Sequence, residues 1–242
     1  MKILYVCHRF PYPPASGAKI RSFHMIRHLH EQGHEVTVAS LYRSPAEEEE
    51  GRGMTQYCSR LITAHVGRAA GVARMLARLP TPIPSSMGYF YSPKLARAVR
   101  EEIATNPPDF IVVHCSSVAH YVTHAEGIPK LLDFADMDSQ KWLAYSTYQG
   151  FPKNLGYWLE GTKLVAAEKR LAARFDLNTC TTPAETATLD SFATGARGAW
   201  FVNGVDTEYF APLDEAPNDR ICFVGRMDYY PNSQAMVKFC AD

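Results

Sequence analysis

The sequence predicts an α/β fold: a Rossmann-like parallel sheet with helices on both faces. Short, nearly all-apolar segments recur along the chain, the first at residues 2–7, and stretches with apolar residues at helical spacing separate them. Continuous apolar strands that alternate with helices are typical of a parallel sheet buried on both faces. The chain has 242 residues, 46% of them hydrophobic, which is enough for such a core.

The individual elements follow from local patterns. After the first strand, Ile20, Phe23, Ile26 and Leu29 mark one face of a helix that Gly33 ends. The sequence TPAE at residues 182–185 has the form of a capping box with proline at the first helical position, so a helix should begin there. We expect further strands at residues 34–41, 110–115, 129–134 and 177–181, and helices at residues 68–79, 93–105 and 153–175.

Composition limits the possible functions. The 25 basic and 25 acidic side chains balance, so no global field favours nucleic acid as a partner. The apolar start of the chain is too short for a signal peptide, and no apolar run approaches the length of a membrane span, which predicts a cytoplasmic protein. The six cysteines form no C-x-x-C pair, which argues against a zinc site and a disulfide framework.

The loop at residues 8–19, HRFPYPPASGAK, follows the first strand and should border the site, because ligands of open parallel sheets bind at the carboxyl ends of the strands. It lacks G-x-G-x-x-G, and no acidic residue ends the second strand, which disfavours a dinucleotide cofactor. Gly17 stands at a helix start, where backbone N–H groups can hold an anion, and Lys19 and Arg21 could add charge. His8 and Arg9 border Gly17 and are further candidates for substrate contact. The alternative is an ordinary proline-rich loop.

Polar residues also end two later strands. His114 should lie at the same sheet edge, either as a substrate contact or as a hydrogen-bonded structural group. Asp133, Asp136 and Asp138 lie at the end of the next strand and are further candidates for substrate contact. Two other interpretations stay open. Asp138 or Ser139 could cap a helix that opens at residue 140, or the D-x-D pair could hold a divalent ion.

Five segments in a fixed order resemble glycosyltransferases of family 4 and the GT-B fold, particularly the sugar transferases associated with the PEP-CTERM exosortase system. They are FPYPPASGAKIRSFHMIRHL, LLDFADMDSQKW, EKRLAARFD, NGVDTEYFAP and VGRMDYYPN. The resemblance implies a metal-independent, two-domain enzyme that transfers a sugar from a nucleotide-sugar donor to an acceptor. Residues 1–205 would form the acceptor-side N-terminal domain, 206–219 a linker, and 220–242 the start of a second Rossmann-like domain, with a strand, a turn and a helix.

The resemblance also implies roles for single residues. Gly17 matches the family's glycine loop near the donor phosphates and the acceptor, and Arg226 matches the arginine that contacts the diphosphate. A guanidinium suits that contact because it can pair two phosphate oxygens. The family also tends to place a polar catalytic or orienting residue, often His, just after the strand that ends here at Phe134, and by that position we favour Asp136 as an acceptor-orienting group or base. The family often has a lysine where this chain has Asn232, and the glutamate pair that grips the donor would lie beyond Asp242. We therefore expect residues 1–242 alone to show no sugar transfer.

The implied partners are a nucleotide-sugar donor and a carbohydrate or lipid-linked acceptor of exopolysaccharide synthesis, with no metal or bound cofactor. Arg68, Arg74 and Arg78 alternate with apolar residues, so this helix could lie on the inner membrane surface or could be an ordinary domain helix. We expect the aromatic and aliphatic residues around Trp158 to pack in the core. Two alternatives remain: a non-enzymatic sugar- or partner-binding module of the same fold, and a metal-dependent transferase that uses Asp136 and Asp138.

Overall fold

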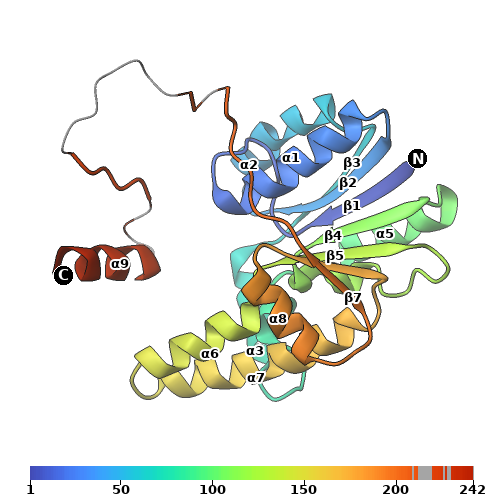
Figure 1. Cartoon of the computed structure of the whole chain (residues 1–242). Coiled ribbons are helices and arrows are strands. Elements are labelled where there is room, and N and C mark those ends of the chain that lie inside the picture. The colour runs from blue at the N-terminus through green and yellow to red at the C-terminus, as the bar shows by residue number, and fades with distance from the viewer. Residues whose placement is uncertain (209, 212–219, 226, 228–229, 242) are drawn as a thin grey trace. The chain divides into compact units, whose positions relative to one another are not determined.

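The computed structural model describes residues 1–208, 210–211, 220–225, 227 and 230–241. The chain divides into two compact units, Met1–Gly204 and Val205–Asp242. The first unit contains the whole sheet (Figure 1). The domain boundaries expected from the sequence stay a prediction.

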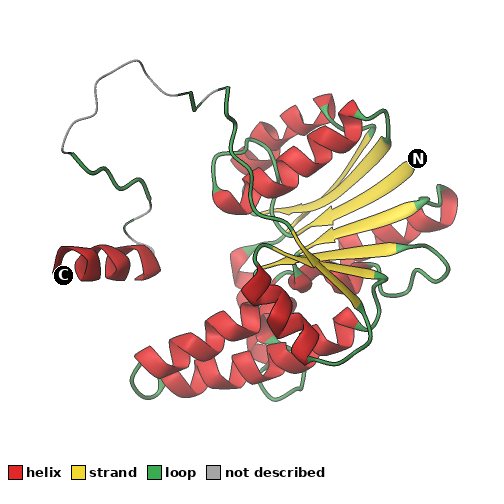
Figure 2. Ribbon diagram, viewed as in Figure 1, coloured by secondary structure: helices red, strands yellow, loops and turns green. Residues whose placement is uncertain are grey.

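The sheet has seven strands in the order β3-β2-β1-β4-β5-β6-β7, and every neighbouring pair is parallel. Helices cover both of its faces (Figure 2). This confirms the predicted Rossmann-like fold class. The strands are β1 (Lys2–Cys7), β2 (Glu35–Tyr42), β3 (Arg60–His65), β4 (Phe110–His114), β5 (Lys130–Ala135), β6 (Leu177–Cys180) and β7 (Arg197–Trp200).

Two buried clusters hold the layers together. On one face Phe23 and Ile26 of α1 pack with apolar side chains of β1 and β2, and on the other face Leu95 and Val99 of α5 and Leu171 of α7 pack against the sheet. The α-helices of the first unit are α1 (Gly17–Glu31), α2 (Pro45–Gly51), α3 (Arg68–Arg78), α4 (Ser85–Tyr89), α5 (Pro93–Thr105), α6 (Asp138–Tyr148), α7 (Lys153–Ala172) and α8 (Pro183–Ser191). Two short 3-10 helices lie at Arg52–Gln56 and Ser116–Tyr121.

The five strands and the helices predicted for the first domain are present, with small shifts at their ends. Strands β3 and β7 were not predicted. β7 contains Gly198 and is mostly exposed, and β3 is only partly buried, so neither is a continuous apolar run. Position in the sheet makes them strands, since each pairs in register with a neighbour along its length.

Helices α6 and α7 lie side by side and form an antiparallel hairpin (Figure 1). Gly161 allows the close contact, because a Cβ there would lie 2.8 Å from Cγ of Leu143. Leu164 and Leu171 are buried as expected, but Trp158 is 52% exposed, so core packing was the wrong prediction for that side chain. It lies in the N-terminal part of α7, whereas the buried Leu164 and Leu171 lie further along the helix.

The second unit contains helix α9 (Tyr230–Ala241). The strand expected before it is not formed in the described residues 220–225, where Ile221 and Val224 are 81% and 91% exposed. A strand requires a neighbour that accepts and donates its backbone hydrogen bonds. Helix α9, in contrast, satisfies its backbone internally.

Candidate active site

The candidate site lies where β1 and β4 meet. The strand order reverses direction between them, and ligands of open α/β sheets bind at such a switch point, outside the carboxyl ends of the strands. His8 directly follows β1 and His114 ends β4. Their rings stack with centroids 6.0 Å apart, and Phe90 packs edge-on against His8 at 5.4 Å. The structure therefore brings together two candidates that are distant in the sequence.

Behind the histidines, a polar row crosses neighbouring strands. His114, Asp133 and Thr179 are register partners on β4, β5 and β6, so their side chains share one face of the sheet. Nδ1 of His114 lies 2.8 Å from Oδ2 of Asp133, and the Thr179 hydroxyl donates to Oδ1 at 2.9 Å. All three side chains are buried.

Arg21 of α1 also binds to Asp133 and completes this network. Its Nε and Nη2 donate to the two oxygens of Asp133 at 2.8 and 2.9 Å, in a bidentate pair. Nη1 donates to the carbonyl of Phe201 and to Oδ1 of Asn203, and the Phe201 ring lies 3.7 Å from the guanidinium carbon. The buried aspartate thus engages the Arg21 guanidinium, and the expectation that Arg21 adds charge for a bound anion stays a prediction.

The surroundings lower the pKa values of Asp133 and His8. Burial alone would raise the pKa of Asp133, but hydrogen bonds and charges from His114 and Arg21 hold it well below its usual range. Burial, together with the nearby His114 and Arg9, holds the pKa of His8 well below 6.5. His8 is therefore a neutral imidazole near pH 7, and a neutral imidazole can accept a proton or a hydrogen bond.

The start of helix α1 offers an open helix terminus beside the loop. Ser16 makes no side-chain capping hydrogen bond, and a Cβ at Gly17 would meet nothing within 4 Å. Packing within the protein therefore does not require glycine at this position. Lys19 is half-buried, with its Nζ 3.9 Å from Oε1 of Glu47, so it stays near the loop.

The start of helix α6 is capped by residues of other helices rather than by a local side chain. The helix begins at Asp138 after Met137, and no local side chain caps it, so the predicted cap by Asp138 or Ser139 is wrong. Glu185 of α8 accepts from the Met137 amide at 2.7 Å, and Glu168 of α7 accepts from the Ser139 amide at 3.0 Å. Carboxyl groups from two other helices therefore satisfy two of the donors at this terminus.

Asp136 is exposed at the carboxyl edge, and Thr181 donates a hydrogen bond to its Oδ1 at 3.1 Å. Ala135 before it has a positive φ of 59°, and the pairing of β5 with β6 is irregular there, so the chain turns out of the strand at this residue. Asp138 is half-buried, and burial raises its pKa. Within the described part of the chain, no three His, Cys, Asp or Glu side chains are arranged to hold a metal ion.

Sequence reasoning named Asp133 but did not identify it as the centre of the network. The available signal was a carboxylate in the apolar strand LLDFA, since a buried charge requires partners. Its partners could not be read from the sequence. Arg9 is half-buried next to His8, and Arg226 lies outside the described residues, so its role stays a prediction.

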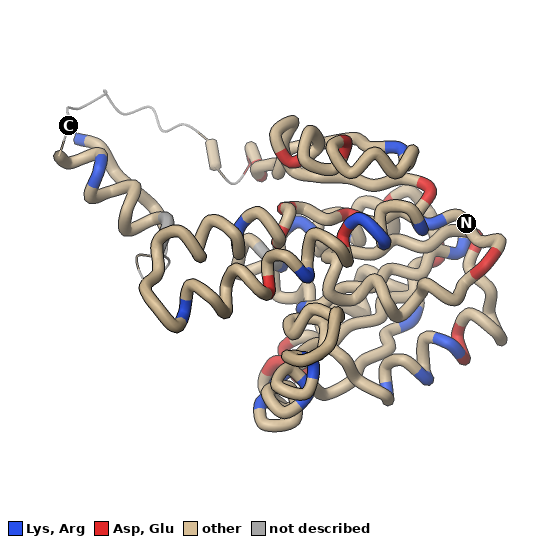
Figure 3. Tube along the Cα trace, turned by 90° about the horizontal axis from the view of Figure 1, so that it is seen from below, with Lys and Arg blue, Asp and Glu red and all other residues tan. Residues whose placement is uncertain are grey.

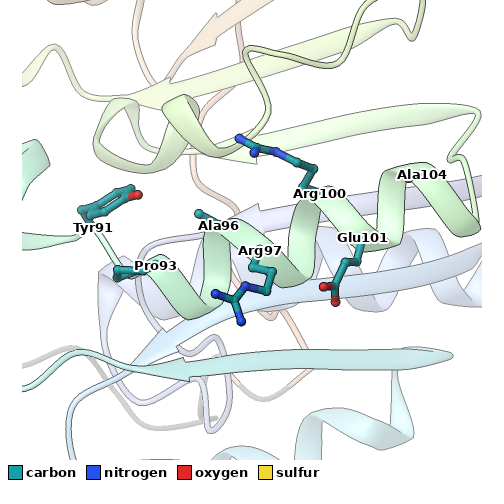
Figure 4. Close-up of a pocket in the computed structure, with 7 residues that line it drawn as sticks. All are labelled: Tyr91, Pro93, Ala96, Arg97, Arg100, Glu101 and Ala104. Atoms are coloured by element: carbon teal, nitrogen blue, oxygen red, sulfur yellow. The ribbon is translucent and has the colours of Figure 1, made fainter.

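Across the described residues, the surface of the chain has no large region of one charge, and it contains hollows outside the polar row. Basic and acidic residues are interspersed along the described trace rather than gathered by sign (Figure 3). One hollow of about 410 Å³ runs along α5, where Arg97 and Arg100 extend from the helix beside Tyr91 (Figure 4). It is built from one helix and the turn before it and contains none of the polar row. A second, apolar pocket lies between α3, α4, α6 and α7 and includes Phe90.

The sequence of residues 15–209 matches the family model described as Glycosyltransferase Family 4. The chain belongs to glycosyltransferase family 4. No curated protein matches it at a significant level. The matched range includes the strands that carry His114 and Asp133, and the roles of the candidate site residues stay predictions.

The chain is similar to several solved structures, and sucrose-phosphate synthase among them agrees with the fold. Sucrose-phosphate synthase from Thermosynechococcus elongatus is 14% identical with a TM-score of 0.58, and the match covers 88% of this chain and 51% of that protein. HepE from Anabaena, solved in complex with UDP, is 16% identical with a TM-score of 0.47, covering 87% and 46% respectively. The family 4 chain thus spans about half the length of these proteins.

Proposed function

We propose that this chain forms the acceptor-side half of a glycosyltransferase that transfers a sugar from a nucleotide-sugar donor to an acceptor hydroxyl. The observation that carries the proposal is the stacked pair His8 and His114 at the switch point of a family 4 domain, in which His114 contacts the buried Asp133. The acceptor is a polysaccharide or a lipid-linked sugar, and the role is in exopolysaccharide synthesis. The resemblance of the five sequence segments supports this finer assignment.

In the proposed reaction, the acceptor oxygen bonds to the anomeric carbon as the bond from that carbon to the nucleotide diphosphate breaks. The acceptor proton passes to a base, and the leaving diphosphate takes the negative charge. Asp136 is exposed at the edge and suits the base or orienting role, while neutral His8 suits a hydrogen bond to the acceptor. The open start of α1 at Gly17 suits the donor phosphates, whereas the start of α6 is occupied by carboxylates.

The proposed location is the cytoplasm, with peripheral contact at the inner membrane surface. Within the described residues, none of the helices is both long enough and apolar enough to cross a bilayer. Large exposed apolar side chains lie on α3, after it, and on the α6–α7 hairpin: Val72, Leu76, Leu79, Ile83, Tyr148, Phe151, Leu155, Trp158 and Leu159. Such a surface suits an interface between water and lipid.

The test is sugar transfer from radiolabelled nucleotide sugars to a lipid or polysaccharide acceptor extract, by the protein that carries this chain. Asp136→Asn should lower kcat/KM by about a hundredfold or more, as expected for loss of a general base. The matched control is Asp190→Asn, an exposed aspartate in the last turn of α8.

Three results would reject parts of the proposal. Equal activity of Asp136→Asn and Asp190→Asn would show that Asp136 is not the base or orienting group. Saturable sugar binding without transfer would favour the non-enzymatic module. Transfer that is lost with a chelator and restored by manganese would favour the metal-dependent alternative with Asp136 and Asp138.

A further inference from the structure

The apolar pocket between α3, α4, α6 and α7 is a built cavity of about 500 Å³, within the size range of small-molecule sites. Aromatic and aliphatic side chains dominate its lining. The residues that line it are Met75, Leu79, Ser85, Ser86, Tyr89, Phe90, Trp142, Lys153, Gly156, Tyr157 and Glu160.

Polar ties hold the walls of this pocket in place. Glu160 of α7 accepts from the amides of Ser85 and Ser86 at 2.9 Å each, which joins α7 to the start of α4. Lys163 of α7 donates to the carbonyls of Arg78 and Leu79 at 3.1 and 2.7 Å, which joins α7 to the end of α3. The pocket is therefore preformed, and a ligand need not order its walls.

The chemistry of the lining selects a hydrocarbon ligand. Of the described residues that line the pocket, two carry charge, and Glu160 is already engaged by the start of α4. The other is Lys153, exposed at the first turn of α7. A ligand would thus meet apolar walls and one cation, which matches a hydrocarbon chain with an anionic group.

Two neighbours of the pocket indicate how such a ligand would be placed. Phe90 lines the pocket and also packs against His8, so one wall continues to the switch point. Leu79 lines the pocket and is 47% exposed, next to the apolar surface of α3 and the hairpin. A chain held in lipid could therefore enter along apolar surface while its head group faces the reacting edge.

We propose that this pocket binds the hydrocarbon chain of an anionic amphiphilic acceptor. The proposal rests on the proposed function and names its acceptor class. Gly156 allows a direct test, because it lines the pocket and a Cβ there would meet nothing within 4 Å. Gly156→Phe should fill the pocket without disturbing the packing of α7. Ala166→Phe is the matched control, since it adds the same ring to an exposed position of the same helix.

The measurement uses the whole chain in a Trp158→Phe, Trp200→Phe background, so that Trp142 in the pocket reports binding. The probe is terminally brominated decyl phosphate below its micelle concentration, since bromine quenches tryptophan on contact. We expect saturable quenching that Gly156→Phe weakens by about tenfold or more, as for loss of a fitted hydrocarbon site, while Ala166→Phe changes it by less than about twofold.

Two comparisons make the result specific. Lys153→Gln should weaken binding of decyl phosphate but not of brominated decanol, and inorganic phosphate should not compete. Absence of saturable quenching, or equal weakening by the two phenylalanine variants, would overturn the proposal. Because binding is measured without transfer, its failure leaves the transferase assignment standing, and loss of transfer alone leaves the pocket standing.

Discussion

At the scale of single residues, Asp133 determines how the candidate site is organised. It is fully buried, yet it is paired with Arg21, His114 and Thr179, so each oxygen has at least two donors nearby. Such a network orients His114 and fixes helix α1, which carries Gly17, against the sheet. Asp133 is therefore a positioning residue, whereas Asp136 and His8 lie at the carboxyl edge of the sheet.

We expect Asp133→Asn to lower the free energy of unfolding by ~3–5 kcal/mol, because it leaves the buried Arg21 charge without its partner. Urea denaturation followed by circular dichroism measures the effect. The control is Asp136→Asn at the exposed end of the same segment, with an expected change below ~1 kcal/mol. Similar losses in the two variants would show that the buried pair contributes no more than an exposed carboxylate.

Glu168 provides a pH-dependent test. It is fully buried, and burial raises its pKa from 4.5 to about 7, helped by the charges of Asp138 and Glu185. Between these pH values the folded chain keeps a proton that the unfolded chain releases, so stability falls as pH rises. Relative to Glu168→Gln, the native chain should lose ~2–3 kcal/mol from pH 4.5 to pH 8, at 1.36 kcal/mol per pKa unit.

Urea titrations of both proteins at the two pH values measure this difference. Glu126→Gln, at an exposed position, serves as the control and should follow the native chain at both pH values. A constant difference between Glu168→Gln and the native chain would mean that folding does not shift the pKa of Glu168.

At the scale of elements, helix starts are satisfied in different ways. Thr182 caps α8 by accepting from the Glu185 amide, as the capping box predicts. The Glu185 side chain, however, caps the amide of Met137 at the start of α6. The pattern therefore identified the start of α8 correctly, while one of its side chains serves another helix. The start of α1, with Gly17, has no side-chain cap.

The α6–α7 hairpin offers a matched pair of glycines. Gly161→Ala should lower the free energy of unfolding by ~1–3 kcal/mol, because the new Cβ would overlap Leu143 and force the helices apart. Gly156→Ala, in the open part of the same helix, should raise it by ~0.5–1 kcal/mol through helix propensity. Chemical denaturation measures the free energy of unfolding of both variants. Changes of the same sign would contradict the prediction.

At the scale of the whole molecule, the first unit combines a polar sheet edge with an apolar helical surface. The hairpin and α3 carry exposed side chains such as Phe151, at 83%, and Trp158, at 52%. The net charge of zero gives no general attraction to an anionic surface, so contact with a bilayer would depend on this apolar region.

Phe151→Ser combined with Trp158→Ser should lower partitioning onto phosphatidylglycerol vesicles by about tenfold or more, since two apolar side chains would leave the interface. Sedimentation of the whole chain with vesicles measures the bound fraction. Trp200→Ser removes an equally exposed tryptophan from β7 and should have little effect. Equal binding of all three proteins would argue against contact through the hairpin.

The sequence by itself determined the elements and the class of fold, because apolar runs, helical spacing, Gly33 and the TPAE cap are local signals. It also placed Gly17, His8 and His114 at the carboxyl edge. Only the tertiary structure decided that Arg21 serves Asp133, 112 residues away, and that an apolar pocket lies beside His8. The reason is physical: the partner of a buried charge and the walls of a cavity depend on packing between distant segments, which no local periodicity encodes.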